Sequence, residues 1–357
     1  MGTTAMSKGG LRIDRPIVLL ASERSGGNLL RAVLGSHSQI VAPSPVHFLI
    51  SIDPLLPLYG DLSEDASFRE ACEDVSRFFQ HQIAGQVEPP DASALFEAAG
   101  ERSLVGLMDA AFRLVMQASG ATRVLLKENE AFRYAHRLAN YYPDIRFLYL
   151  VRDGRDAALS WLKSPNHSGG ISHISRTWRD EQRACLSLLC DPGLSSRIQV
   201  VHYEDLVSKP REIVESLCGF VEVAFEESML EFHGRDEIRE QSAGVRNWEN
   251  LSKPIMEQNF NKHQKELGWW RAQTFNQIAH RELAALGYDV PKPSSVHRLG
   301  IQVLDVSREG LGLALKAARG RVPKPVEVLA RGRRRRNFGR IASELEARQR
   351  PRWPRQD

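Results

Sequence analysis

Near its N-terminus the chain carries the stretch Ile17-Val18-Leu19-Leu20-Ala21-Ser22-Glu23-Arg24-Ser25-Gly26-Gly27-Asn28-Leu29-Leu30-Arg31. Its first five residues are apolar and predict a short buried strand. A Gly-Gly pair follows, and leucine and valine then recur at helical spacing through position 34. A strand, a glycine-rich turn and a helix gather backbone N–H groups at a helix N-terminus, where they hold a phosphate. Arg24 adds a fixed positive charge to this turn.

Four further apolar runs predict strands, and predicted helices separate most of them. The strands are expected at 39–42, 124–126 (ending at Lys127), 146–151 and 198–203, and the helices at 130–141, 157–162, about 175–190 and 210–220. This alternation predicts an α/β fold of three layers, with a central and mostly parallel sheet covered on both faces. Ligands bind such sheets at the carboxyl ends of the strands. We therefore expect the Arg24 turn and the segment Arg152–Asp156 to form one site.

The chain divides into three predicted parts. Residues 1–15 are expected to be a flexible N-terminus, 16–291 a catalytic domain, and 292–357 a basic and largely disordered tail. Within the domain, residues 53–121 show a mostly helical pattern with no catalytic signature. This helical insertion either covers a substrate cleft or simply packs into the core.

Composition excludes several classes of protein. Of the 357 residues, 42% are apolar and 26% charged, as in ordinary soluble globular proteins. The four cysteines form no C-x-x-C pair, which favours buried free thiols over a zinc site or a disulfide framework. No N-terminal apolar core resembles a signal peptide, and no run approaches the roughly 20 apolar residues of a membrane span. These features predict a cytoplasmic protein.

The net charge of +4 conceals an asymmetry between the tail and the rest of the chain. Residues 292–357 carry 17 Lys or Arg and 6 Asp or Glu, a net +11, which leaves a net −7 for residues 1–291. The tail fits a solvated arm, a contact with an anionic membrane surface, or non-specific nucleic-acid binding. It gives no sign of sequence-specific nucleic-acid recognition. A solvated or weakly anion-binding arm is the default interpretation.

The glycine-rich turn does not match the kinase-type motif G-x-x-x-x-G-K-[ST]. The required lysine is missing, Arg31 comes too late to replace it, and Asn28 stands where a Mg²⁺-binding hydroxyl would be needed. The turn therefore fits an anion that is bound without a metal ion.

Two segments together resemble the sulfotransferase family, which uses 3′-phosphoadenosine 5′-phosphosulfate (PAPS) as donor. Residues 23–30 resemble the family's 5′-phosphosulfate loop, and residues 147–160 resemble its 3′-phosphate segment, an apolar strand followed by R-D-x-R-D-x-x-x-S. Tyr203–Leu206, Val245–Trp248 and Leu283–Tyr288 resemble later family segments in the same order. The R-S-G sequence is similar to the bacterial and Golgi-type branch.

This resemblance implies a P-loop-like fold and transfer of a sulfuryl group from PAPS to an acceptor hydroxyl or amine, with no metal. It implies that Arg24 lies beside the sulfuryl group, and that Arg152 and Ser160 bind the 3′-phosphate. The residues implied for the 5′-phosphate are Ser25, Gly26, Gly27, Asn28 and Leu29. Those implied to lie near the nucleotide are Arg246 and Trp248. An ion pair with a neighbouring aspartate is the alternative for Arg152.

The sequence departs from the family where a general base is expected. In the R-S-G branch a glutamate often follows the second strand, and here Pro45 occupies that position. His47 remains, and imidazole titrates near neutral pH. We expect His47 to be the base, with simple packing beside Phe48 as the alternative. Lys127 is expected near the donor sulfate or the acceptor, or else as a solvated lysine at a strand end.

Three functions remain open from the sequence. The first is an active sulfotransferase, the second a sulfotransferase-like nucleotide-binding protein that has lost its base, and the third another P-loop-type transferase or kinase. A kinase would need Mg²⁺ and ATP, whereas a sulfotransferase would bind adenosine 3′,5′-bisphosphate without metal. The acceptor is not specified: a glycan, a lipid, a peptide tyrosine and a small metabolite all remain open.

Overall fold

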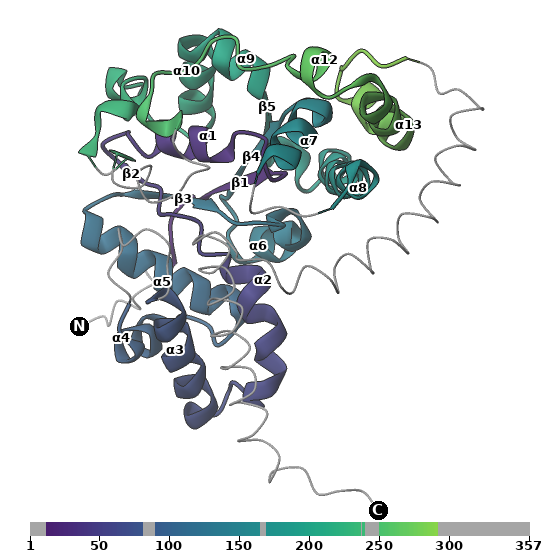
Figure 1. The fold of residues 1–357 in the computed structure, drawn as a ribbon. Coiled ribbons are helices and arrows are strands. Elements are labelled where there is room, and N and C mark those ends of the chain that lie inside the picture. The colour runs from purple at the N-terminus through teal and green to yellow at the C-terminus, as the bar shows by residue number, and fades with distance from the viewer. Residues whose placement is uncertain (1–11, 81–89, 165–168, 237, 240–249, 292–357) are drawn as a thin grey trace, which may run out of the picture.

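The computed structural model describes residues 12–80, 90–164, 169–236, 238–239 and 250–291 (Figure 1). Short strands alternate with helices, as the sequence predicts. The strands are β1 (Ile17–Ala21), β2 (Ile40–Val41), β3 (Arg123–Lys127), β4 (Arg146–Val151) and β5 (Ile198–His202). The α-helices are α1 (Gly27–Leu34), α2 (Phe48–Ile52), α3 (Asp65–Phe79), α4 (Ala92–Ala98), α5 (Leu104–Ser119), α6 (Ala135–Tyr141), α7 (Gly154–Lys163), α8 (Ile171–Leu189), α9 (Tyr203–Ser208), α10 (Pro210–Phe220), α12 (His263–Glu266) and α13 (Trp269–Ala285). The 3₁₀ turns are η2 (Asp53–Tyr59), η3 (Ala131–Tyr134), η4 (Ser195–Arg197), η5 (Glu227–Met229) and η6 (Phe232–Gly234).

The five strands form one parallel sheet in the order β2-β3-β1-β4-β5. The central strand β1 pairs with β3 on one side, where Ile17 lies opposite Leu125, and with β4 on the other, where it lies opposite Arg146. The chain leaves β1 toward the β2 edge and later returns across β1 to β4. The carboxyl ends of β1 and β4 therefore flank the point where strand order reverses, which is the usual ligand crevice of open α/β sheets.

Alternate residues of β1 enter two separate cores because strand side chains point to opposite faces. Val18 and Leu20 pack with helices α2, α3, α5, α7, α8 and α13 on one face. Ile17 and Leu19 pack with α1, α9 and α10 on the other. All four are 1% exposed. The sheet is thus the middle of three layers, and the predicted P-loop-like α/β fold is confirmed.

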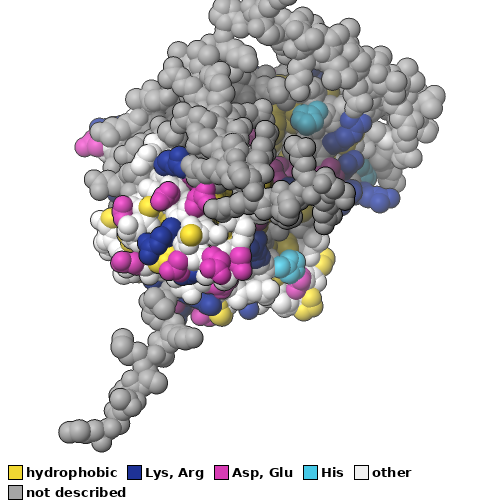
Figure 2. All heavy atoms as spheres, turned by 90° about the horizontal axis from the view of Figure 1, so that it is seen from below, with side chains coloured by type: hydrophobic (Ala, Val, Ile, Leu, Met, Phe, Trp, Pro, Cys, Tyr) yellow, Lys and Arg dark blue, Asp and Glu magenta, His cyan; other side chains and the backbone are white. Residues whose placement is uncertain are grey.

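The segment between β2 and β3 is helical, as its periodicity predicts, and lies at the lower end of the molecule in Figure 1. Its helices pack around a cluster of phenylalanines: Phe48 lies 6.2 Å from Phe79 and 6.5 Å from Phe112 between ring centroids. These rings belong to the same core as β1 and β3. From below, the coloured part of this face carries acidic, basic and apolar side chains interspersed (Figure 2).

Several element boundaries differ from the sequence-based expectation: among them, α7 begins at Gly154, three residues before the predicted start. Helix α8 begins at Ile171, about four residues before the predicted start near Ser175. Ser175 does not cap the helix: it lies inside, and its hydroxyl donates to the Ile171 carbonyl at 2.7 Å. Tyr203 opens α9 and does not end β5. Among the described helices, none is both long and apolar enough to cross a membrane.

Candidate functional site

The turn after β1 closes tightly over the start of α1. Gly26 is the N-cap of α1 and has a φ of 93°. A Cβ atom at Gly26 would come within 2.4 Å of the Tyr203 ring, so both the backbone conformation and the close approach require glycine. Ser25 is 1% exposed, and its hydroxyl has no hydrogen-bond partner among the described residues; the same holds for the side-chain oxygen of Asn28. The Ser25 hydroxyl can donate to an anion beside this helix N-terminus, whereas the Asn28 side-chain oxygen can only accept.

Three cationic side chains gather around this turn. A Cβ atom at Gly27 would lie 2.9 Å from Lys127 Cε, so Lys127 extends across the first turn of α1. Burial, followed by the charge of Arg31, lowers the pKa of Lys127 to about 8. Arg31 is itself 1% exposed, and burial lowers its pKa to about 10. The charge of Arg24 also lowers the pKa of Lys127. An anion bound here would relieve this mutual repulsion.

The segment after β4 meets the turn, as the sequence predicts. Arg24 Nε donates to Ser160 Oγ at 3.1 Å, and Arg152 Nη1 donates to the Arg24 carbonyl at 3.1 Å. The Arg152 guanidinium also lies 4.3 Å from the Tyr203 ring centre, and its Nη2 donates to the Asn259 carbonyl at 3.1 Å. Arg152 forms no ion pair with Asp153 or Asp156 in the described structure. The structure therefore brings Arg24, Ser160 and Arg152 together.

A buried network fixes the segment that carries Arg152. Asp153 caps α7, pairs with Arg155 at 2.7 Å, and donates its backbone N–H to Glu204 Oε1 at 2.9 Å. The other oxygen of Glu204 accepts from Tyr288 at 3.1 Å. The Tyr203–Leu206 segment thus supports the loop between β4 and α7, a positioning role that its sequence alone does not reveal.

The carboxylate of Glu128, which sequence reasoning missed, contacts the backbone at His47. His47 is the N-cap of α2 and has a left-handed backbone, with φ 59°. Glu128, next to Lys127, accepts from the Leu49 N–H at 3.2 Å and from the backbone N–H groups of His47 and Phe48. Glu128 is 4% exposed, and burial outweighs these bonds and raises its pKa to about 8. A lone Glu after a strand gives no local signal of this contact.

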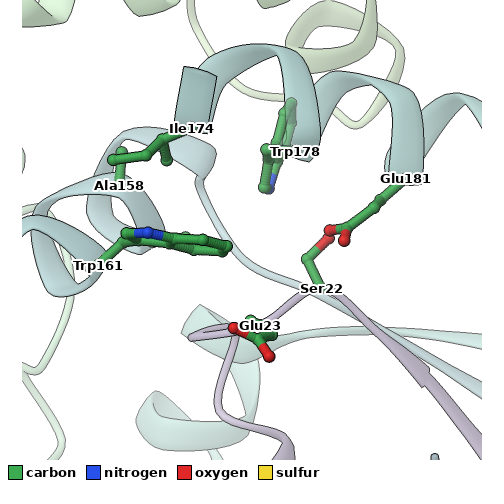
Figure 3. Close-up of a pocket in the computed structure, with 8 residues that line it drawn as sticks. Ser22, Glu23, Ala158, Trp161, Ile174, Trp178 and Glu181 are labelled. Atoms are coloured by element: carbon green, nitrogen blue, oxygen red, sulfur yellow. The ribbon is translucent and has the colours of Figure 1, made fainter. Parts of the chain in front are cut away.

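A pocket opens beside the turn, between α7 and α8 (Figure 3). Its cavity volume is about 10 Å³, which is roughly the space of one water molecule. We call it the tryptophan pocket. It is lined by Ser22, Glu23, Ala157, Ala158, Trp161, Ile174, Trp178 and Glu181. Its lining residues were not predicted as site residues, because they become neighbours only when α8 folds back onto the end of β1.

Some predicted residues are not placed by the structure. Arg246 and Trp248, expected near the nucleotide, lie outside the described residues, and so does the basic tail 292–357. Among the residues that are described, no group of three or more His, Cys, Asp or Glu side chains is arranged to hold a metal ion.

The parallel sheet and the cationic turn at its reversal point define a P-loop-like α/β protein. The chain matches the model described as "Sulfotransferase family" over residues 16–227, more than half its length, and therefore belongs to that family.

Two solved structures share the fold. The sulfotransferase domain from the Synechococcus PCC 7002 olefin synthase has a TM-score of 0.53 and 22% identity, and covers 81% of this chain and 100% of that domain. The sulfotransferase domain from the curacin biosynthetic pathway has a TM-score of 0.53 and 20% identity, and covers 78% of this chain and 100% of that domain. An uncharacterized protein from Aquifex aeolicus (strain VF5) is 23% identical over 232 residues, which are 61% of this chain but only 27% of that protein. The chain thus spans about a quarter of that relative.

Proposed function

We propose that this protein is a sulfotransferase that moves a sulfuryl group from PAPS to an acceptor hydroxyl by in-line displacement. The observation that carries the proposal is the junction of Arg24, Ser160 and Arg152 beside the N-terminus of α1. The β1 turn offers cationic and hydroxyl groups to one phosphate, and the β4 segment offers them to the other. Family membership supports the same reaction class.

In this proposal the turn residues Ser25–Leu29 receive the 5′-phosphate, and Arg152 with Ser160 receives the 3′-phosphate. In the same proposal, Arg24 and Lys127 stabilise negative charge on the departing phosphate. Sulfuryl transfer resembles phosphoryl transfer in that positioning and charge stabilisation do most of the catalysis. The cationic cluster at the turn supplies both.

Transfer to a hydroxyl also needs a group that accepts its proton. His47, proposed from the sequence, donates its backbone N–H to Glu128, the chain neighbour of Lys127. Glu181, in the tryptophan pocket, is a second titratable group beside the turn. His47→Ala and Glu181→Gln, each assayed for sulfuryl transfer, decide between them: the variant that loses turnover while keeping bisphosphate binding identifies the base.

Calorimetric titration with adenosine 3′,5′-bisphosphate in EDTA tests the proposed donor site. We expect metal-independent binding that Arg152→Ala weakens by about 10- to 100-fold, because a charge-assisted contact to phosphate is worth about 1.5–3 kcal/mol. Arg211→Ala is the matched control, since Arg211 is half-exposed on α10 and pairs with Glu227.

Two results would contradict the proposal. One is no binding of the bisphosphate in EDTA. The other is binding of ATP that requires Mg²⁺, which would favour the kinase alternative.

A further inference from the structure

Exposed aromatic surface gathers where α12 meets α13. Among the described residues, three large hydrophobic side chains are exposed: Val200 on β5 (37%), Trp270 (37%) and Trp269 (63%). The two tryptophans are neighbours in the chain, and their ring centroids lie 6.1 Å apart. Single apolar side chains are common on protein surfaces, but each tryptophan has about 150–250 Å² to bury. An adjacent pair left at the surface therefore indicates a binding surface.

The two tryptophans stand on a fixed backbone. We call residues 262–271 the α12–α13 corner, and it lies away from the helical insertion (Figure 1). Before the pair, His263 donates its backbone N–H to Asp156 Oδ1 at 2.7 Å, and Leu267 is 1% exposed. After the pair, Phe275 is fully buried. Residues on both sides thus anchor the corner to the rest of the protein and hold the indole rings at the surface.

Cationic side chains accompany the tryptophans. Lys262, Lys265 and Arg271 are exposed, and Glu266, the one acid of the corner, pairs with Lys163 of α7. Residues 262–271 carry three Lys or Arg and one Glu, a net +2. Indole rings and the long stems of lysine and arginine are favoured at the boundary between water and lipid headgroups. Each cation near an anionic leaflet strengthens partitioning by about fivefold, so the chemistry of the corner matches an anionic phospholipid surface.

Two other kinds of partner match the corner less well. A stable protein–protein interface buries about 800 Å² on each side, more than two partly exposed indole rings supply. Single-stranded nucleic acid needs a basic track with successive bases stacked on aromatic rings. A net charge of +2 neutralises few phosphates, and the two rings are tilted by 45° to each other and so offer no common plane for stacking.

We propose that the α12–α13 corner docks on an anionic phospholipid membrane, with Trp269 and Trp270 among the lipid headgroups and the lysines facing the lipid phosphates. Stable attachment to a membrane takes two signals. The second is the basic tail 292–357, whose net +11 supplies long-range attraction and which follows α13 in the chain. Neither the corner nor the tail is expected to hold the protein on a membrane alone.

Helix α7 connects this surface to the proposed donor site. It carries Ser160, which accepts from Arg24, and, three residues on, Lys163, which pairs with Glu266 of the corner. Docking would therefore hold the donor site near the lipid surface. The inference goes beyond the proposed function and does not depend on it, because membrane binding needs no PAPS.

The first test is sedimentation of the full chain with vesicles of phosphatidylcholine, alone or with about 30% phosphatidylserine. We expect binding to the anionic vesicles only. Trp269→Ser/Trp270→Ser should weaken it by at least about tenfold, because the variant removes the apolar rings. Val200→Ser is the matched control, since Val200 is as exposed as Trp270 but lies outside the corner, and should bind like wild type.

The charges of the corner are tested in the same assay. Lys262→Gln/Lys265→Gln should weaken binding by about 25-fold at low salt, at about fivefold per lysine, and by less at high salt, which screens the attraction. Lys209→Gln is the control, because Lys209 is an exposed lysine that lies outside the corner.

The second test shows which tryptophans enter the membrane. The chain has six tryptophans, and brominated lipids in the anionic vesicles quench the fluorescence of those that insert. Trp269→Phe/Trp270→Phe keeps two aromatic rings at the corner, so it should still bind but lose most of the quenching. Quenching that persists in this variant would place the insertion at another tryptophan and overturn the proposal.

Thermal melts that match wild type show that each variant is folded, and if the serine variant melts early, the phenylalanine variant decides. Vesicle binding by Trp269→Ser/Trp270→Ser equal to wild type, or no binding of wild type to anionic vesicles, would overturn the proposal. Binding of a DNA oligonucleotide that depends on the same tryptophans, without vesicle binding, would assign the corner to nucleic acid instead. Each of these failures leaves the proposed function untouched, and absence of bisphosphate binding leaves the membrane proposal untouched.

Discussion

At the scale of single residues, a substitution at Gly26 tests how closely the turn must approach its neighbours. Gly26→Ala would place a methyl group 2.4 Å from the Tyr203 ring and force alanine to a φ of 93°. We expect a loss of roughly 1–3 kcal/mol from the backbone alone, further loss from the clash, and weakened bisphosphate binding. Chemical denaturation and calorimetry measure these two effects.

Gly120→Ala is the control for that substitution. Gly120 has a φ of 70°, but no atom lies within 4 Å of the position of a new Cβ. It should therefore show the backbone cost without the clash, and leave bisphosphate binding unchanged. Equal destabilisation of both variants would show that Tyr203 moves aside freely.

Lys127 gives the proposed donor site a pH dependence. Its pKa of about 8 in the free protein means that the ammonium is lost as pH rises through that value. A bound anion favours the charged form, so bisphosphate affinity should fall above about pH 8, by up to tenfold per pH unit. Titrations between about pH 7 and 9.5, where the phosphates are fully ionised, measure this. Lys127→Met should bind more weakly and show a flat profile over that range; an unchanged slope would assign the effect to another group.

The site residues expected from the sequence and those named only from the structure differ in a simple way. Arg24, Arg152 and Ser160 stand at strand ends or one helix away, so the topology of a parallel sheet is enough to bring them together. Glu128 and Glu181 reach the site only through burial against other elements. Their carboxylates carry no spacing signal, because a single Glu on a helix or after a strand is most often exposed.

At the scale of elements, Glu128 holds the start of α2. Its folded pKa of about 8 lies above the ordinary value of 4.5, so the folded state binds a proton that the unfolded state releases. The contribution of Glu128 to stability is therefore greatest at low pH and falls as pH rises from about 5 to about 8. Glu128→Gln does not titrate, so its melting temperature relative to wild type should rise over that interval. Thermal melts across this range, with Glu97→Gln as the exposed control, measure it; parallel curves for Glu128→Gln and wild type would show that the carboxyl does not titrate there.

Element order was predictable because the apolar runs are short and glycine or proline separates them from the helical patterns. The boundaries of the elements were less predictable. Tyr203 looks like the last residue of an apolar strand, yet its ring lies beneath Gly26 and its backbone begins α9. The 3₁₀ turn η3 interrupts what reads as one helix over 130–141. For Tyr203, packing against Gly26, in a distant element that no local pattern reveals, accompanies this boundary.

At the scale of the whole molecule, the basic tail is expected to be separable from the proposed donor site. The residues proposed for the two phosphates, Arg24, Ser25–Leu29, Arg152 and Ser160, all lie between 24 and 160. Deletion of 292–357 should therefore leave bisphosphate affinity within about twofold of the full chain, since distant sites are usually independent. It should also abolish any binding to anionic vesicles, which sedimentation measures at low and high salt. A large loss of bisphosphate affinity would place part of the donor site in the tail.

The strand order of the sheet also has a consequence for synthesis on the ribosome. β1 is made early, yet both its partners come much later: Leu19 lies opposite Lys127 and Leu148. At translation rates of about 5–20 residues per second, β1 waits on the order of 5–20 seconds for its first partner strand. During that time the apolar run Ile17–Leu20 remains unpaired in the nascent chain, a natural target for chaperones. The same central strand that organises the finished fold is thus exposed to aggregation while the fold is being made.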